Sequence, residues 1–100
     1  MMLNINKQFD EGKLYVTLDG RLDTTTSPEL EKSLSESLPE VKELVLDLEK
    51  LEYISSAGLR VLLTAQKTMA KQGSMKLVHV NDLVMEILEV TGFVDILTIE

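Results

Sequence analysis

One stretch near the middle of the chain decides the fold. It reads Leu51-Glu52-Tyr53-Ile54-Ser55-Ser56-Ala57-Gly58-Leu59-Arg60-Val61-Leu62-Leu63. An apolar run typical of a strand precedes this stretch, and a long run with the apolar spacing of a helix begins within it. Ser55 and Ser56 stand at the junction, where a serine oxygen can accept a hydrogen bond from a free amide of the first helical turn. A helix start also attracts anions, so a phosphate on either serine would be compatible with the fold.

The segments upstream of this junction predict a hairpin, a helix and a buried strand. Leu3–Phe9 and Leu14–Leu18 alternate apolar and polar residues around a glycine-containing turn, which predicts two antiparallel strands. The next segment carries a leucine at every fourth position, which predicts an amphipathic helix capped by either Thr26 or Ser27. Consecutive apolar residues within Val41–Leu48 predict a third strand that is covered on both faces.

The segments downstream predict a further helix, strand, helix and strand. The second helix spans about Ala57 to Gln72, and Gly73 is placed to end it in the left-handed conformation. Leu59, Leu62, Leu63, Ala65, Met69 and Ala70 form its expected apolar face. The other predicted elements are a strand at Met75–Val80, a helix capped by Asn81 or Asp82 with Leu83, Val84, Ile87 and Leu88 inward and Gly92 at its end, and a strand at Val94–Ile99.

The predicted order, β-β-α-β-α-β-α-β, is typical of a single α/β domain over residues 1–100. Right-handed crossovers would make its mixed sheet mostly parallel, with helices packed on it. Loops that follow neighbouring parallel strands meet at one edge of such a sheet, where ligand sites tend to form. Asp23, Thr24 and Thr25 follow the second strand, and the serine pair follows the third. Asp23 either forms a turn or contacts a partner, and Arg60 either contacts a partner or is solvated.

Composition narrows the function classes. The 100 residues carry a formal net charge of −7, which disfavours binding to nucleic acid and favours a protein partner. The chain has no cysteine and one histidine, so few ligands exist for a transition metal and no disulfide can form. No apolar run is long enough to cross a membrane and no signal peptide is evident, so a cytoplasmic protein is expected.

The junction resembles the switch segment of the STAS domain in bacterial anti-sigma-factor antagonists, where Asp-Ser-Ser/Thr-Gly-Leu opens a helix. Ser56 takes the position of the phosphorylated serine, and Gly58-Leu59 matches the Gly-Leu pair. Two positions depart, because Ser55 replaces the usual Asp and Ala57 replaces a common Ser or Thr. Ser55 is therefore a competing acceptor. The segment Gly20 to Asp23 also resembles the family's Gly-x-Leu-Asp element, which lies beside the phosphoserine.

The resemblance implies a switch protein. Its unphosphorylated form would bind an anti-sigma factor that is also a serine kinase, and would thereby free a sigma factor. Phosphorylation of Ser56 would end binding, and a serine phosphatase would restore it. The expected partner-binding residues are Asp23, Thr24, Thr25, Ser55, Ala57, Gly58, Leu59 and Arg60.

Catalysis is not expected, and neither is a cofactor or a bound metal. The Gly-x-Ser-x-Gly elbow and the phosphate-binding loop with its lysine are absent from the sequence. His79 is interpreted as structural or exposed, and Asp47 as solvated or structural. Two other hypotheses remain open: a STAS sensor that binds a small molecule or nucleotide at the same edge, and an interaction subunit of a larger complex that works without phosphorylation.

Overall fold

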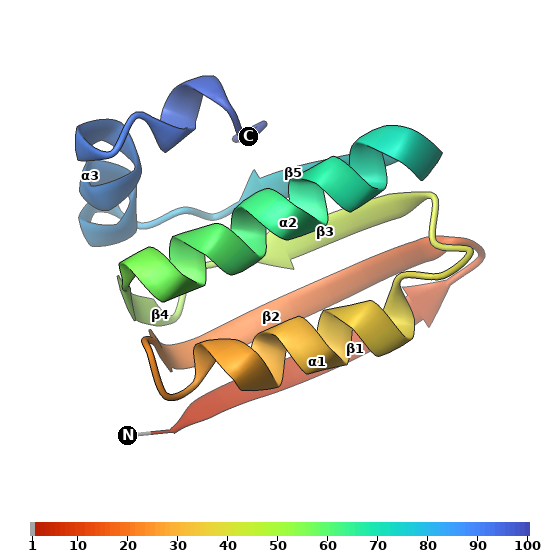
Figure 1. The fold of residues 1–100 in the computed structure, drawn as a ribbon, viewed down its shortest axis with the longest axis horizontal. Coiled ribbons are helices and arrows are strands. Elements are labelled where there is room, and N and C mark those ends of the chain that lie inside the picture. The colour runs from red at the N-terminus through yellow and green to blue at the C-terminus, as the bar shows by residue number, and fades with distance from the viewer. Residues whose placement is uncertain (1) are drawn as a thin grey trace.

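A mixed sheet forms the centre of the computed structural model, which describes residues 2–100 (Figure 1). Its strands are β1 (Leu3–Asp10), β2 (Lys13–Leu22), β3 (Glu43–Asp47), β4 (Leu51–Ile54) and β5 (Ser74–Val78). Its helices are α1 (Ser27–Ser37), α2 (Ser56–Gln72) and α3 (Asp82–Val90), followed by a short 3₁₀ helix, η1 (Phe93–Asp95). The strand order is β1-β2-β3-β5, and β4 also pairs with β2. This confirms the predicted fold class.

Strand β2 organises the sheet because it is bonded on both sides. It pairs antiparallel with the whole of β1, which confirms the predicted hairpin. On its other side its first half pairs in parallel with β3, and Gly20–Leu22 then pairs in parallel with β4. The pairing with β3 ends at Thr17, and the pairing with β4 begins at Gly20 and has a register shift between Gly20 and Arg21. The second strand is therefore longer than predicted, since it continues past Leu18 to Leu22.

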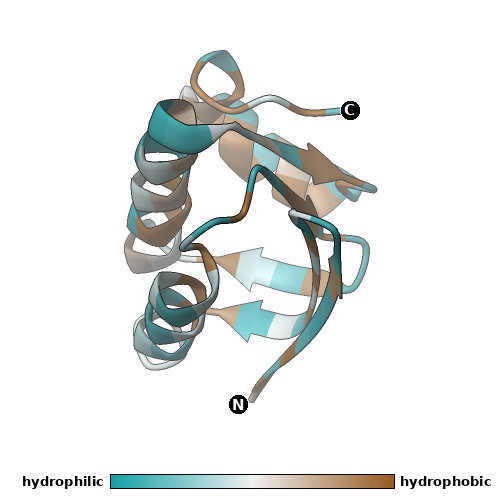
Figure 2. Ribbon diagram, turned by 90° about the vertical axis from the view of Figure 1, so that its right-hand side faces the viewer, coloured by the Kyte–Doolittle hydropathy of each residue, from teal (hydrophilic) through white to brown (hydrophobic). Residues whose placement is uncertain are grey.

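The core lies between one face of the sheet and the helices α1 and α2, which run side by side over it (Figure 2). Successive residues of a strand point to opposite faces. The core-facing side chains of β2 and β3 include Leu14, Val16, Leu18, Leu44 and Leu46, none of which has measurable exposure. The consecutive apolar residues of β3 are all buried, as predicted, because Val45 is only 1% exposed on the other face.

Two of the predicted strands need correction. The third strand does not run through Val41–Leu48: β3 covers only Glu43–Asp47, and the unpredicted β4 follows after a turn. The expected last strand at Val94–Ile99 is replaced by η1 and by a single bridge between Ile99 and Leu77. That bridge covers part of the outer edge of β5. The actual element order is thus β-β-α-β-β-α-β-α, with no full strand at the end of the described chain.

The helix ends and faces also differ from expectation in detail. Gly73 has φ 175°, which is extended rather than left-handed, and a side chain there would overlap the backbone oxygen of Lys42. Close approach of the chain therefore requires glycine at this position. Gly92 does adopt the left-handed conformation after α3, with φ 80°. Ala70 and Leu83 were expected to face inward, but both are exposed.

Candidate functional site

The two serines at the start of α2 have different roles. Ser55 is the N-cap: its backbone is extended, and its Oγ accepts a hydrogen bond of 3.2 Å from the amide of Gly58. Ser56 is the first helical residue and is exposed. Its hydroxyl makes no side-chain hydrogen bond to any residue that the structure describes. The capping interpretation thus holds for Ser55, while Ser56 presents a free hydroxyl to solvent.

Strand β4 brings this helix start to the end of β2. Leu22 pairs with Ile54, and the amide of Ser55 donates a 2.8 Å hydrogen bond to the carbonyl of Leu22. Gly58 makes the close approach sterically feasible, since a Cβ atom there would lie 2.7 Å from Cγ of Leu22. The two predicted loops therefore meet at one edge of the sheet. They meet through β4, however, and not through the third strand as expected.

The loop after β2 is built around the carboxylate of Asp23. Its Oδ1 accepts hydrogen bonds from the amide and hydroxyl of Thr25, at 3.0 and 2.8 Å, and from the amide of Thr26 at 3.1 Å. The hydroxyl of Thr25 is the first cause, and the amide of Thr26 the second, of a pKa of Asp23 below its usual value. Asp23 therefore forms a turn, the first of its two expected roles. Thr24 and Thr25 are exposed beside it.

The start of α1 resolves the other open alternative. Thr26 occupies the N-cap position, and Pro28 lies in the first turn. No capping box forms, because the hydroxyl of Thr26 donates 2.7 Å back to the carbonyl of Arg21 and accepts from the amide of Asp23. The hydroxyl of Ser27 donates to the carbonyl of Asp23 at 2.5 Å. The hydroxyls at this helix start therefore fasten the loop rather than the helix.

Sequence reasoning missed an aromatic contact at the same edge. The guanidinium of Arg21 lies over the ring of Tyr53, with its Cζ atom 4.5 Å from the ring centroid. Arg21 Nε also lies 3.9 Å from Asp23 Oδ2. Arg21 faces Tyr53 in the β2–β4 register, so the contact depends on a strand that was not predicted. In the Gly-x-Leu-Asp resemblance of this segment, Arg21 occupies the unspecified position and carries no predicted role.

The remaining predicted site residues lie in the first turn of α2. Arg60 is exposed, Ala57 is half-buried, and Leu59 is only 6% exposed. Leu59 and Gly58 therefore belong to the packing beneath the helix start. Of the predicted site residues, those that are open to solvent are Thr24, Thr25, Ser56 and Arg60.

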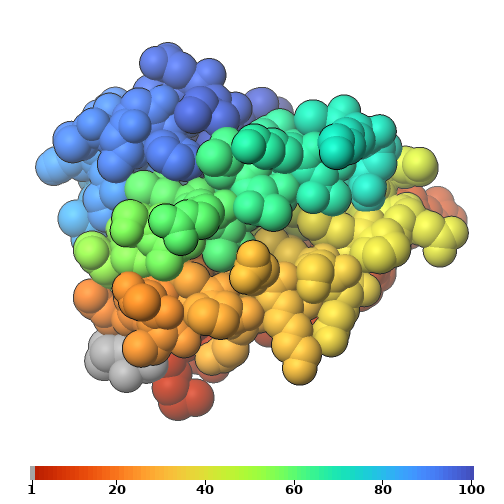
Figure 3. Space-filling model, viewed as in Figure 1, coloured from red at the N-terminus to blue at the C-terminus, as the bar shows by residue number. Residues whose placement is uncertain are grey.

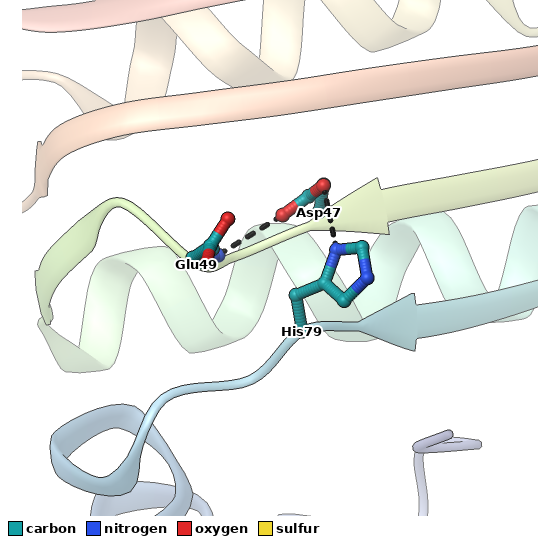
Figure 4. Close-up of side chains that lie close together, drawn as sticks. All are labelled: Asp47, Glu49 and His79. Atoms are coloured by element: carbon teal, nitrogen blue, oxygen red, sulfur yellow. Dashed lines mark hydrogen bonds and ion pairs between the residues drawn. The ribbon is translucent and has the colours of Figure 1, made fainter.

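A second polar cluster lies at the ends of β3 and β5 (Figure 4). Oδ2 of Asp47 accepts a 2.7 Å hydrogen bond from the hydroxyl of Tyr15 and lies 2.9 Å from Nδ1 of His79. Burial alone would raise the pKa of Asp47, but the hydrogen bonds from His79 and Tyr15 outweigh it and hold that pKa low. The same pairing raises the pKa of His79. Asp47 and His79 are thus structurally engaged, as the sequence suggested.

An apolar cavity of about 320 Å³ lies away from both clusters, between α1 and α2 on the face shown in Figure 3. Leu34 and Leu38 of α1 face Val61 and Ala65 of α2 across it. The serine pair does not line it, so it is not the ligand site expected at the sheet edge by the sensor hypothesis. No helix among residues 2–100 has the length and apolar character needed to cross a membrane.

The family model of the STAS domain matches residues 4–100. This chain belongs to the STAS domain family. The resemblance seen at the serine junction is therefore confirmed over nearly the whole sequence. BtrV of Bordetella bronchiseptica is 36% identical over 88 residues, which cover 86% of this chain and 76% of BtrV. The anti-sigma F factor antagonist of Paenibacillus polymyxa is 32% identical over 102 residues, which cover 99% of this chain and 87% of that relative.

Solved structures of STAS proteins share the fold. An anti-sigma factor antagonist from Mycobacterium paratuberculosis superposes with a TM-score of 0.88 at 21% identity, covering 98% of this chain and 85% of the other. The Bacillus cell fate determinant SpoIIAA in its phosphorylated form gives a TM-score of 0.73 at 15% identity, covering 99% of this chain and 91% of the other. At these identities the two structures show a shared fold.

Proposed function

We propose that this protein is an anti-sigma factor antagonist whose binding is switched off by phosphorylation of Ser56. The observation that carries the proposal is the division of labour at the start of α2. Ser55 is half-buried and its oxygen already caps the helix, whereas Ser56 is exposed with a free hydroxyl. Two comparisons support the proposal. Relatives are named as anti-sigma factor antagonists, and a protein with a similar fold is known in a phosphorylated form.

The partner is an anti-sigma factor with serine kinase activity. It supplies ATP, Mg²⁺ and a base that takes the hydroxyl proton of Ser56. The Ser56 oxygen forms a bond to the γ-phosphorus, the bond from that phosphorus to the bridging oxygen breaks, and ADP leaves. A serine phosphatase restores the hydroxyl by hydrolysis. All of these partners act in the cytoplasm, and this chain contributes the acceptor rather than a catalytic group.

The phosphate acts by charge and bulk at the docking edge. It adds roughly −1.5 to −2 charges at neutral pH. The first turn of α2 tolerates that charge, because the helix N-terminus presents free amides and a positive dipole end. The fold is therefore retained while the complex weakens. A loss of about 2–3 kcal/mol of binding free energy corresponds to roughly 30- to 150-fold in affinity, which is enough for a switch.

The docking surface is the edge formed by the β2–α1 loop and the start of α2. Asp23 holds the loop, and Thr24, Thr25 and Arg60 face solvent beside the serine. With a net charge of −7, the chain is suited to a partner whose docking surface is basic.

Phosphorylation can be tested by incubating the chain with ATP, Mg²⁺ and candidate anti-sigma kinases, followed by intact-mass measurement and site mapping. We expect one added phosphate, lost in Ser56→Ala and retained in Ser55→Ala. Phosphate on Ser55 alone would keep the function but move its site. A kinase that binds the chain tightly and transfers no phosphate would overturn the switch and favour the interaction-subunit hypothesis.

The binding switch can be tested separately by titrating the anti-sigma factor with Ser56→Asp. We expect affinity to fall about 30-fold or more, while Ser56→Ala binds like the native chain. A matched control is Thr68→Asp, which places the same charge on α2 three turns from the serine. If Ser56→Asp and Thr68→Asp weakened binding equally, the effect would be general repulsion rather than a local switch.

A further inference from the structure

Three ligand-type side chains from separate parts of the sequence converge at the ends of β3 and β5 (Figure 4). Asp47 ends β3, Glu49 lies in the turn that follows, and His79 comes directly after β5. One donor atom from each, two carboxylate oxygens and an imidazole nitrogen, lie within 4.8 Å of one another. Asp47 follows Leu46, which faces the core, so its side chain lies on the opposite face of the sheet. The cluster therefore lies on the face of the sheet opposite α1 and α2, away from Ser55 and Ser56 at the start of α2.

The central carboxylate is held rigidly. Asp47 is only 13% exposed, and both of its oxygens are hydrogen-bonded. Oδ1 accepts a hydrogen bond of 3.1 Å from the amide of Glu49. Oδ2 accepts one of 2.7 Å from the hydroxyl of Tyr15. Metal-binding carboxylates commonly have such hydrogen-bonded support, which fixes their orientation. Tyr15 can keep its hydrogen bond to Asp47 whether the space between Asp47 and His79 holds a proton or a cation.

The charges of the cluster favour a dication. Two carboxylates stand against a single imidazole, which contributes at most one positive charge. Glu49 is exposed and His79 is 61% exposed, so an ion can reach the cluster from solvent and Glu49 can rotate toward it. The chain contains no other histidine and no cysteine that could compete for the ion.

We propose that Asp47, Glu49 and His79 form a binding site for one Zn²⁺ ion. Imidazole nitrogen and carboxylate oxygen are both ordinary zinc ligands, and a water molecule would complete the tetrahedron. Neighbouring ligands of a tetrahedral zinc ion lie about 3.3 Å apart, given bonds of about 2.0 Å. Nδ1 of His79 and Oδ2 of Asp47 are 2.9 Å apart, so binding needs only a small separation of this pair and an approach by Glu49.

The ion would join two connections that the fold already brings together. The side-chain amide of Asn81 donates to the carbonyls of Leu48, Glu49 and Leu51, which ties the start of α3 to the β3–β4 turn. Zinc bound by His79 and Glu49 would add a second tie between the same two connections. Because the unfolded chain cannot assemble these ligands, binding would stabilise the native state.

The test is a titration of the untagged full chain with zinc chloride in a non-chelating buffer, followed by calorimetry and by the imidazole NMR signals of His79. We expect one ion per chain, a shift of the His79 signals and a rise of several degrees in melting temperature. Glu49→Gln should weaken zinc binding by about tenfold or more, and His79→Gln should weaken it further. Mg²⁺ should bind far more weakly than zinc, because an imidazole is a poor ligand for it.

The matched control is Glu86→Gln, which removes an exposed carboxylate from α3, outside the cluster. It should bind zinc like the native chain. Equal affinity in Glu49→Gln and Glu86→Gln, or unshifted His79 signals under zinc excess, would overturn the proposal. Glu49→Gln keeps the Asp47–His79 pair intact, so the test does not depend on a variant that disturbs the sheet.

Discussion

The start of α1 and the start of α2 both carry adjacent hydroxyl residues, but the fold uses them in opposite ways. At α1, the hydroxyls of Thr25, Thr26 and Ser27 all donate to oxygen atoms of residues 21–23. At α2, Ser55 accepts a bond from an amide and Ser56 remains exposed without a described side-chain partner. A hydroxyl that already donates must break a bond before a kinase can use it. Availability for modification is therefore decided by local geometry, not by hydroxyl content.

The largest expected effect comes from Gly58→Ala, which would separate the start of α2 from β2. The added methyl group would meet buried Leu22, with its Cγ at 2.7 Å and its carbonyl oxygen at 3.0 Å. Overpacking of this kind should destabilise the fold by about 2–3 kcal/mol, measured by urea unfolding. Gly92→Ala is the control, because nothing lies within 4 Å of that site and only the left-handed backbone costs energy, about 1 kcal/mol. Equal losses in the two variants would contradict the close packing.

Thr26→Val should have the next largest effect, because it would unfasten the start of α1. The side chain is nearly isosteric and its residue is only 3% exposed. The change leaves the carbonyl of Arg21 and the amide of Asp23 without their hydroxyl partner. We expect a loss of about 2 kcal/mol in unfolding free energy. Exposed Thr24→Val should change stability by less than about 0.5 kcal/mol, and a similar loss in both variants would contradict the locked loop.

The serine pair at α2 should divide clearly in a stability measurement. Ser55→Ala removes the N-cap and should cost about 1 kcal/mol. Ser56→Ala removes an exposed, unbonded hydroxyl and should cost less than about 0.5 kcal/mol. Thermal unfolding of the two variants side by side would measure the difference. The reverse order would mean that Ser56 caps the helix and that Ser55 is the free hydroxyl.

The smallest expected effect is the contribution of Asp23 to the pH dependence of stability. The pKa of Asp23 is lowered in the folded state, so its charged form contributes stability above the unfolded value near 3.8. That contribution is lost as pH falls through the lowered pKa. Asp23→Asn keeps an oxygen acceptor but no charge. The native chain should exceed Asp23→Asn in urea midpoint at pH 7, and the gap should narrow toward pH 2. A gap independent of pH would assign the effect to shape rather than to charge.

The sequence predicted the elements whose own residues show a clear strand or helix pattern. The hairpin alternates over enough residues to be recognised, and α2 has a clear cap and a wide apolar face. The meeting of the β2–α1 loop with the start of α2 was also predicted, because the loops that follow neighbouring parallel strands lie at the same edge of a sheet. By contrast, β4 has only four residues, and its buried-exposed-exposed-buried pattern does not alternate. Its place is fixed by pairing with Gly20–Leu22, which lies some thirty residues earlier in the chain.

Other misses share this dependence on distant partners. Gly73 was assigned a backbone role, but the need for glycine comes from Lys42 on another strand connection. Tyr53 meets Arg21 only through the β2–β4 register. Val94–Ile99 has the composition of a strand, yet only Ile99 forms a bridge to β5. The composition of a segment indicates which secondary structures it can form, and its packing against the rest of the chain decides which one it adopts.

Strand β2 has a consequence for how motion spreads through the molecule. It is bonded to β1 along eight register pairs and is shared on its other side between β3 and β4. Its inner amides should therefore be the last to exchange with deuterated water, since they open only when the whole sheet does. The start of α2, where we propose the switch, is attached to the far end of this strand by the hydrogen bond from the Ser55 amide to the Leu22 carbonyl. A structural change at the start of α2 would therefore have to open β2, the slowest-exchanging strand, before it could spread. We expect such a change to stay at the surface of the protein.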